Sequence, residues 1–363
     1  MNVVKLASVI GLLGFWLPVA AQLTYYGADS FPLFGKTSEQ TETRYERLPA
    51  TLRDRARPPV WALGKNTAGL YLRFKSNTAS IGLKWTLYQN RMMNHMTATG
   101  IKGFDLYCLE GNKWVFVNSA RPEVNSMANE AVIIANMDTT HKEFMLCFPL
   151  YDGVVDLQIG VDSLATITPP AVDLPVSTKP VVCYGTSIQQ GGCASRPGMA
   201  HLNILTRWFN REFVNLGFSG NAKLDYEIAE LIGARDASLI VLDFMPNVGV
   251  ALIEEKLEEF YRIVRQKAPH TTILFVENPI YPHAAFDGKV RETIDDKNAA
   301  MHAVFHRLVA SGEQRIHIVP ALGMLGTDNE ATVDGVHFTD LGFMRYANHL
   351  YPYIEKYMNN QGE

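Results

Sequence analysis

The segment TPPAVDLPVSTKP, residues 168–180, has four prolines in thirteen positions and separates two parts of the chain with different sequence patterns. Proline donates no backbone hydrogen bond and fixes φ, so this segment cannot continue a sheet and favours an extended connection. The chain of 363 residues also exceeds what one hydrophobic core usually organises. The sequence therefore predicts two domains, residues 22–168 and 180–363, joined by a proline-rich linker at 169–179.

The first predicted domain consists of short runs rich in β-branched and aromatic residues. In GLYLRF and SIGLKWTLY apolar and polar residues alternate, as they do in a half-buried strand. The run CLEGNKWVF predicts a hairpin whose turn uses Gly111 and Asn112. No helical pattern longer than a couple of turns interrupts these runs. We therefore expect an antiparallel β-sandwich of the jelly-roll kind.

The second predicted domain alternates between apolar runs of strand length and helical patterns. The strand-like runs are PVVCYG, FVNLGFSG, SLIVLDFMPN, TTILFVENP and RIHIVPAL. Between them, Ile253, Leu257, Phe260 and Val264 fall on one face of a predicted helix. Strands that alternate with helices predict a parallel sheet covered on both faces, which is an open three-layer α/β domain.

The residues that follow each strand of such a sheet are where chemistry is expected, because ligands bind at the carboxyl ends of the strands. Ser187 follows the first predicted strand, residues 217–221 follow the second and residues 245–247 follow the third. Asp334 and His337 lie in the loop after the fifth strand. A serine, a base and a carboxylate are thus expected at one edge of the sheet.

Ser187, His337 and Asp334 are the residue types that a nucleophilic serine requires. Asp334 precedes His337 by three residues, in a loop with Gly335, so its carboxylate can turn back to accept the imidazole N–H. This contact would fix the tautomer so that the other ring nitrogen faces Ser187. Each residue has an ordinary alternative: a serine after a strand is more often a helix cap, and the other two could be solvated surface residues.

Three donors are candidates for an oxyanion hole: the backbone N–H of Ser187, that of Gly220, and the side-chain amide of Asn247. Gly220 could instead be only a turn residue with positive φ, and Asn247 only a turn former after Pro246. The hypothesis of an esterase site is favoured because four separate strand ends supply complementary groups.

Four sequence blocks carry a resemblance to a known family. YGTSI, NLGFSGN, DFMPN and DGVHFTDLG resemble, in this order, the four blocks of SGNH hydrolases, also called GDSL-type esterases. The serine, glycine, asparagine and histidine that name the family would be Ser187, Gly220, Asn247 and His337. The resemblance covers about residues 180–360 and implies a flavodoxin-like three-layer fold and acyl-ester hydrolysis without a metal or another cofactor. Upstream, TGIKGFDLY resembles the GxDLY motif of a β-sandwich domain that precedes certain bacterial SGNH hydrolases.

Two of these blocks depart from the family pattern. Thr186 stands where the family name has aspartate, a position that does not carry the chemistry. Met245 and Pro246 replace the usual glycine-containing residues before Asn247. In agreement with a mechanism that uses no metal, we find no cluster of His, Cys and carboxylate residues with metal-ligand spacing in the sequence.

The resemblance implies attack of Ser187 on an ester carbonyl, formation of an acyl-enzyme, and deacylation by water activated through His337. An exported enzyme with a fused β-sandwich suggests an acylated carbohydrate as substrate, with acetyl as the first expected acyl group. A lipid acylhydrolase or thioesterase is the alternative within enzymes, and the polar stretch after SIQQ argues against it. A non-catalytic glycan-binding protein is the alternative from another class, and the complete set of triad residues argues against it.

Six residues are candidates for contact with substrate. The loop NRMMNHMTATG before the GxDLY motif could reach over the catalytic edge, or could be a surface hairpin that packs the two domains together. An arginine after the nucleophile could contact a polar substrate or form a structural ion pair. Two further residues follow the fourth strand. The candidates are Arg91, Asn94, His95, Arg196, Tyr281 and His283.

The first residues, MNVVKLASVIGLLGFWLPVAAQ, have the form of a secretory signal peptide over residues 1–21, with cleavage before Gln22. The alternative is an uncleaved membrane anchor, but the apolar run is shorter than the ~20 residues that a spanning helix needs. We therefore expect a bacterial protein that is exported to the periplasm or secreted, without stable membrane insertion after cleavage.

A formal net charge of −4 gives no reason to expect a nucleic-acid partner. Four cysteines in a chain of this length do not form a disulfide scaffold, and their spacing does not tell whether any pair is bridged.

Overall fold

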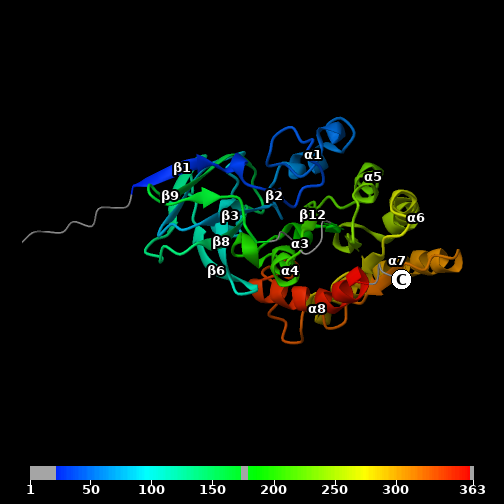
Figure 1. Ribbon diagram of the computed structural model, residues 1–363. Coiled ribbons are helices and arrows are strands. Elements are labelled where there is room, and N and C mark those ends of the chain that lie inside the picture. The colour runs from blue at the N-terminus through cyan, green and yellow to red at the C-terminus, as the bar shows by residue number, and fades with distance from the viewer. Residues whose placement is uncertain (1–21, 173–178, 360–363) are drawn as a thin grey trace, which may run out of the picture.

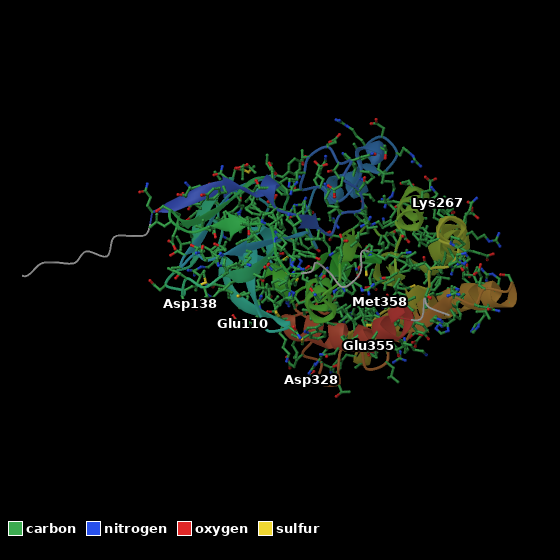
Figure 2. The ribbon with its side chains drawn as sticks, viewed as in Figure 1. Glu110, Asp138, Lys267, Asp328, Glu355 and Met358 are labelled. Atoms are coloured by element: carbon green, nitrogen blue, oxygen red, sulfur yellow. The ribbon has the colours of Figure 1, made fainter. Side chains whose placement is uncertain are left out.

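The computed structural model describes residues 22–172 and 179–359. Figure 1 shows a β-rich part in blue and cyan beside a part in which helices surround a central sheet. The predicted signal peptide, and residues 173–178 of the predicted linker, lie outside the described residues. In Figure 2, charged side chains such as Glu110 and Asp328 lie at the outside of the two parts.

The β-rich part is an antiparallel sandwich of two sheets, as the alternating sequence pattern predicts. One sheet has the strand order β1-β9-β4-β7, with β1 (Leu23–Gly27), β4 (Ile81–Leu87), β7 (Ala128–Ile134) and β9 (Val154–Asp162). The other has the order β10-β3-β8-β5-β6, and β2 pairs with β3 at its side. Its strands are β2 (Leu33–Phe34), β3 (Tyr71–Ser76), β5 (Phe104–Glu110), β6 (Lys113–Ala120), β8 (Lys142–Cys147) and β10 (Ile167–Thr168).

A buried cluster that includes Trp85, Phe104 and Phe144 fills the sandwich. The predicted hairpin joins β5 to β6, where Glu110 pairs with Lys113 across Gly111 and Asn112. Gly111 has φ +59°, a value that glycine adopts without the steric cost of a Cβ. The helical segments of this part are short: η1 (Ala28–Ser30), η2 (Ala50–Leu52), α1 (Pro58–Gly64) and α2 (Ala98–Lys102).

The second part contains a five-stranded parallel sheet with the order β12-β11-β13-β14-β15. This order, 2-1-3-4-5 by position in the chain, is that of a flavodoxin-like doubly wound fold. The strands are β11 (Val181–Gly185), β12 (Phe213–Gly217), β13 (Leu239–Asp243), β14 (Ile273–Val276) and β15 (Ile316–Val319). Val181 is level with Phe213 of β12 on one side and with Leu239 of β13 on the other, so these three neighbouring strands end at one edge of the sheet.

Helices cover both faces of this sheet. They are α3 (Ser187–Gln190), α4 (His201–Phe209), α5 (Tyr226–Ala234), α6 (Val250–Lys267), α7 (Gly288–Ala310) and α8 (Asp340–Asn359), with the short helices η3 (Pro197–Met199), η4 (Met245–Asn247) and η5 (Pro282–Ala285). Alternate strand residues enter two different cores: Val182 and Tyr184 pack with α5 and α6, whereas Val181 and Cys183 pack with α4 and α8. The apolar face predicted for α6 is buried.

A segment of the first part packs onto the second part. Leu48, Val60 and Leu63, in and before α1, belong to the same buried cluster as Val214 and Leu216 of β12. The two parts therefore share apolar core, which fixes the position of the β-sandwich relative to the parallel sheet. Among the helices of the described ranges, none has both the length and the apolar composition needed to cross a bilayer.

Candidate active site

Ser187 follows the end of strand β11, which lies between β12 and β13, and is the first residue of the short helix α3. Thr186 caps this helix, because its hydroxyl accepts a hydrogen bond from the backbone N–H of Ile188 at 3.3 Å. Gly191, with φ +102°, ends the helix after one turn. Gly217 at the end of β12 allows α3 to pack closely, since a Cβ there would lie 2.3 Å from the backbone nitrogen of Gln190. These constraints hold Ser187 at the sheet edge with its side chain mostly buried.

The structure brings Ser187, His337 and Asp334 together in one hydrogen-bonded line. The hydroxyl of Ser187 lies 2.8 Å from Nε2 of His337, and Nδ1 of His337 lies 2.7 Å from Oδ2 of Asp334. A carboxylate only accepts hydrogen bonds, so Nδ1 carries the imidazole hydrogen and Nε2 presents a lone pair to the serine. In this arrangement the histidine can take the hydroxyl proton and the aspartate can stabilise the imidazolium that forms.

Asp334 is held in its ionised form by its hydrogen bonds. Its Oδ1 accepts the backbone N–H groups of Val336 at 3.0 Å and of His337 at 2.8 Å. Burial opposes ionisation, but the hydrogen bonds from the ring and backbone of His337 and from Val336 outweigh it, and the pKa of Asp334 falls to about 2. The carboxylate is therefore charged over the whole neutral range.

The loop that carries Asp334 and His337 makes a tight turn that requires glycine. Gly335 has φ +89°, and a Cβ at this position would lie 3.0 Å from Nδ1 of His283. The backbone N–H of Val333 donates to the carbonyl of His337 at 2.8 Å and closes the loop. The turn thereby directs the carboxylate back toward the imidazole, as the three-residue spacing predicts.

The candidate oxyanion donors follow three neighbouring strands. Gly220 comes after β12, has φ +68° and is exposed, with open space where a Cβ would stand. Asn247 ends η4 after β13, and its Oδ1 accepts the backbone N–H of Ala222 at 3.2 Å. Since this bond uses the oxygen of the amide, it leaves the NH₂ group of Asn247 for another partner. Ser187 itself follows β11, between the other two strands in the sheet.

The loop before the GxDLY motif reaches the catalytic edge from the β-sandwich. The ring of His95 lies beside that of His337, with a centroid distance of 5.5 Å, and its Nδ1 is 2.8 Å from Oδ1 of Asn94. The fully buried carboxylate of Asp152 anchors the start of this loop by accepting the backbone N–H groups of Gln89 and Arg91 at 2.9 and 2.7 Å. No sequence pattern indicates this anchor, because the loop and Asp152 are about sixty positions apart.

Arg196 forms the structural ion pair that the sequence left as an alternative to substrate contact. Its Nη1 lies 2.7 Å from the buried carboxylate of Asp105, the aspartate of the GxDLY motif, and 2.6 Å from the hydroxyl of Tyr107. Its guanidinium also lies over the ring of Phe116, 3.7 Å from the centroid. Arg196 thus ties the loop after Ser187 to the β-sandwich.

Tyr281 and His283 lie next to the catalytic loop. Their rings stack at 5.8 Å, and together with Val336 and Lys297 they line a pocket of about 240 Å³. Burial raises the pKa of Tyr281 and lowers the pKa of Lys297 to about 8. Nζ of Lys297 donates to the side-chain oxygen of Asn278 at 3.0 Å. Lys297 lies within a helical pattern, and nothing in the sequence distinguishes it from a surface lysine.

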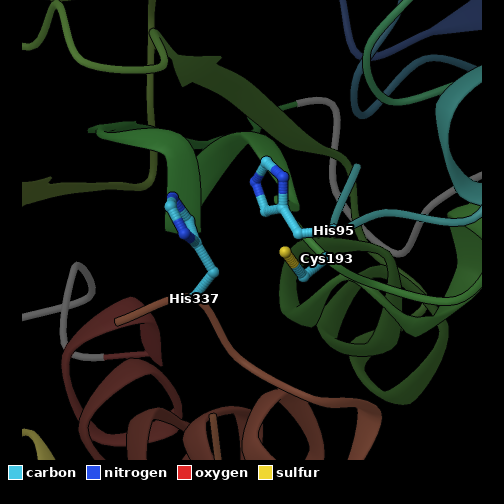
Figure 3. Close-up of side chains that lie close together, drawn as sticks. All are labelled: His95, Cys193 and His337. Atoms are coloured by element: carbon cyan, nitrogen blue, oxygen red, sulfur yellow. The ribbon is translucent and has the colours of Figure 1, made fainter. Parts of the chain in front are cut away.

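Cys193, like the anchor formed by Asp152 and the buried Lys297, is a site feature that the sequence does not explain. All four cysteines are free thiols, and Cys193 is buried with φ +73°. The ligand atoms that Cys193, His95 and His337 offer all lie within 4.8 Å of one another. Figure 3 shows these three side chains gathered at the catalytic edge. Because they come from segments far apart in the chain, their grouping has no recognisable spacing in the sequence.

Comparison with known families covers both parts of the chain. The GDSL-like lipase/acylhydrolase family matches residues 178–355. The family described as the N-terminus of SGNH-hydrolase-type esterases matches residues 23–167. No curated protein sequence matches the chain.

Among solved structures, a GDSL-like lipase from Bacteroides ovatus ATCC 8483 is 35% identical to this chain, with a TM-score of 0.88 over 93% of this chain and 98% of the other. A salicylyl acyltransferase from a tetracycline biosynthetic pathway is 15% identical, with a TM-score of 0.75 over 94% and 99% of the two chains. An acetyl xylan esterase from the rumen bacterium Butyrivibrio proteoclasticus is 11% identical, with a TM-score of 0.56 over 94% and 100%. The last two show a shared fold.

Proposed function

Because the chain belongs to the GDSL-like lipase/acylhydrolase family and is an esterase of the SGNH type, we propose that it is an exported serine esterase that removes short acyl groups, acetyl above all, from a carbohydrate. The observation that carries the proposal is the line from Asp334 through His337 to Ser187, with distances of 2.7 and 2.8 Å.

In the proposed reaction, Nε2 of His337 takes the proton of the Ser187 hydroxyl while the serine oxygen attacks the ester carbonyl. The tetrahedral intermediate collapses to an acyl-enzyme, and His337 returns the proton to the leaving alcohol. Water then gives its proton to His337 and attacks the acyl-enzyme, which releases the acid and restores Ser187. Asp334 keeps its charge throughout and stabilises the imidazolium.

The developing oxyanion would be bound by the backbone N–H groups of Ser187 and Gly220 and by the amide of Asn247. The contact between Oδ1 of Asn247 and the N–H of Ala222 supports this role. It holds the amide through its oxygen and leaves the NH₂ group to donate to the oxyanion. Donors that are held in place before the reaction stabilise charge without a cost of reorganisation.

A carbohydrate substrate is supported by a groove between the β-sandwich and helices α4 and α8. The groove has a volume of about 570 Å³ and is lined by aromatic and cationic side chains. Trp208 and Phe116 are each 40% exposed, and Arg207 and Lys113 lie beside them. Flat aromatic faces next to hydrogen-bond donors suit the apolar and hydroxyl-bearing sides of a sugar ring. The acetyl xylan esterase of the same fold also acts on a carbohydrate ester, by its name.

The short acyl group is supported by the polar, glycine-rich stretch after Ser187, which does not resemble a lid for a long chain. Export is supported by the signal-peptide pattern of residues 1–21.

Nitrophenyl esters of increasing chain length, followed by acetate release from acetylated polysaccharides, test the proposal. We expect kcat/KM to fall from acetate to octanoate and acetate to be released from at least one glycan. A preference for octanoate would favour a lipid acylhydrolase, and activity on acyl thioesters alone would favour a thioesterase.

The role of the groove is tested by Trp208→Ala, with Phe286→Ala as the control. Phe286 is also an exposed aromatic side chain, but it lies outside the groove. We expect Trp208→Ala to lower activity on the polysaccharide at least tenfold more than activity on nitrophenyl acetate. Equal effects of the two variants on both substrates would show that the groove does not bind the polysaccharide.

A further inference from the structure

We propose that His95, Cys193 and His337 form a binding site for a thiophilic divalent metal ion such as Zn²⁺, and that the bound ion reversibly switches the esterase off. The metal site stands on its own geometry, whereas the inhibitory effect rests on the proposed function of His337 as the base. The three side chains come from the loop before the GxDLY motif, from the loop after Ser187 and from the loop after β15 (Figure 3).

Both imidazoles are oriented to offer a lone pair from the same ring position. Nδ1 of His337 faces the carboxylate of Asp334 at 2.7 Å, and Nδ1 of His95 faces the side-chain oxygen of Asn94 at 2.8 Å. These oxygens accept hydrogen bonds, so Nδ1 carries the hydrogen in each ring and Nε2 presents a lone pair, which in His337 faces the hydroxyl of Ser187. A histidine whose second nitrogen donates to a carboxylate or an amide oxygen is the usual form of a metal ligand.

Cys193 supplies a sulfur ligand from a backbone conformation that cysteine rarely adopts. Its φ of +73° lies in the left-handed region, where a residue with a Cβ pays a steric cost that glycine avoids. Strained residues of this kind gather at binding and active sites. The sulfur of Cys193 lies within 4.8 Å of a ring nitrogen of His337 and of a ring nitrogen of His95.

Two imidazole nitrogens and one sulfur are a donor set that suits Zn²⁺. With bonds of about 2.0–2.1 Å to nitrogen and 2.3 Å to sulfur, tetrahedral ligand atoms lie roughly 3.3–3.6 Å apart. The ligand atoms that these side chains offer lie within 4.8 Å of one another, so shortening the separations by roughly 1.2–1.5 Å completes the set. The side chain of His95 is partly exposed, which gives it room for such a movement.

Metal binding and catalysis compete for one atom. Nε2 of His337 accepts the proton of Ser187 in the proposed reaction, and the same lone pair would form the bond to the metal. On binding, the thiol of Cys193 releases its proton to the solvent as sulfur bonds to the ion, while Ser187 keeps its proton and loses its base. Water or the serine hydroxyl completes the fourth position. The ion is therefore an inhibitor, and a chelator should restore activity.

The first experiment measures hydrolysis of nitrophenyl acetate against Zn²⁺ concentration. We expect micromolar Zn²⁺ to inhibit the wild type and EDTA to restore it. Cys193→Ser should keep basal activity, because Cys193 takes no part in the reaction, and should raise the inhibitory concentration at least tenfold. Cys108→Ser, which removes another buried thiol, should behave as the wild type. Equal inhibition of Cys193→Ser and the wild type would overturn the site.

The second experiment detects the site without activity. Ser187→Ala is titrated with Co²⁺, and the absorption band of a thiolate bonded to cobalt is followed, with Ser187→Ala/Cys193→Ser as the control. We expect the band only when Cys193 is present. A band in Ser187→Ala, together with a wild type that hydrolyses no ester, would support the site and contradict the proposed function instead. Absence of the band, or an esterase that EDTA inactivates and Zn²⁺ restores, would overturn the proposal.

Discussion

The carboxylate of Asp334 sets the proton positions on which the proposed chemistry depends. Asp334→Asn keeps the shape of the side chain but removes the charge and can present an N–H to the ring, which favours the wrong tautomer of His337. We expect kcat on nitrophenyl acetate to fall on the order of 10³- to 10⁴-fold, with KM little changed. Activity within about tenfold of the wild type would contradict the role of Asp334.

The lowered pKa of Asp334 also predicts how the free energy of unfolding depends on pH. The pKa of Asp334 is about 2 in the folded protein, below its ordinary value of 3.8. The ionised carboxylate therefore stabilises the fold above about pH 4, and this contribution disappears as the pH falls toward 2. We expect the difference in unfolding free energy between wild type and Asp334→Asn to shrink between pH 5 and pH 2, as measured by urea denaturation. A difference that grows on acidification would contradict this assignment.

The block that contains Asn247 departs from the family pattern at Met245 and Pro246, just before this residue, so the role of Asn247 needs a separate test. Loss of one oxyanion donor costs about 3 kcal/mol in the activation barrier, and Asn247→Ala should lower kcat by a factor on the order of 10² to 10³. The control is Asn348→Ala, which removes an exposed amide on α8 that donates to the backbone carbonyl of Met344. Equal kcat values for the two variants would exclude Asn247 from the oxyanion hole.

At the scale of elements, the loop after the nucleophile is held by β5. The buried carboxylate of Asp105 accepts hydrogen bonds from Arg196 and from the backbone N–H of Gly198, both at 2.7 Å. Asp105→Asn leaves the partly buried guanidinium of Arg196 without its counter-charge, and removal of one partner of a buried pair costs on the order of 3 kcal/mol. We expect this loss in the unfolding free energy measured by urea denaturation.

The control for this pair is Asp295→Asn. Arg291 and Asp295 form an i,i+4 pair on the surface of α7, with side chains more than half exposed. Such pairs contribute about 0.5 kcal/mol or less. If Asp105→Asn were as mild as Asp295→Asn, the motif aspartate would not anchor the loop.

Most elements could be predicted from the sequence because their patterns are local. The buried face of α6, the five strand-like runs and the hairpin at Gly111 follow from periodicity and turn chemistry alone. The packing of α1 onto β12 could not be predicted, since a seven-residue helix leaves no long period and its partner is about 150 positions away. The anchoring of the loop by Asp152 could not be predicted either, because the two are about sixty positions apart in the chain.

At the scale of the whole molecule, segments of the first part, α1 among them, pack into the interior of the α/β part, while the β-sandwich also has a core of its own. The fully buried guanidinium of Arg47 donates to the carbonyls of Leu63 and Asn66 and also to those of Asn215 and Gly217 in β12. The hydroxyl of Tyr151 in turn donates to the carbonyl of Ser187 at 3.2 Å. The backbone that presents the candidate nucleophile is thus supported from the β-sandwich.

This shared interior predicts that the two parts unfold together. Separation would expose the apolar surface around Leu48 and Val60 and leave buried carbonyls of β12 without donors. We expect one calorimetric transition, with the same midpoint when followed by far-ultraviolet circular dichroism. Two transitions of separate midpoints would show that the parts are independent.

The catalytic edge itself could be anticipated from the order of strands and loops, because parallel strands bring their carboxyl ends to one side. That argument places Ser187, Asp334 and His337 near one another, as the structure has them. It does not reach His95 or Cys193, whose positions depend on how a loop of the β-sandwich folds over that edge. The order of strands and loops thus predicts that Ser187, Asp334 and His337 lie together. The residues around them depend on long-range packing that the sequence pattern does not show.

The most direct test of the central claim compares kcat/KM on nitrophenyl acetate for the wild type and for Ser187→Ala. If Ser187 is the nucleophile of an esterase, the variant should retain the circular dichroism spectrum of the wild type and lose activity by a factor on the order of 10⁴ to 10⁶. A folded Ser187→Ala protein that keeps more than roughly a tenth of the wild-type kcat/KM would contradict the assignment of Ser187 as the nucleophile.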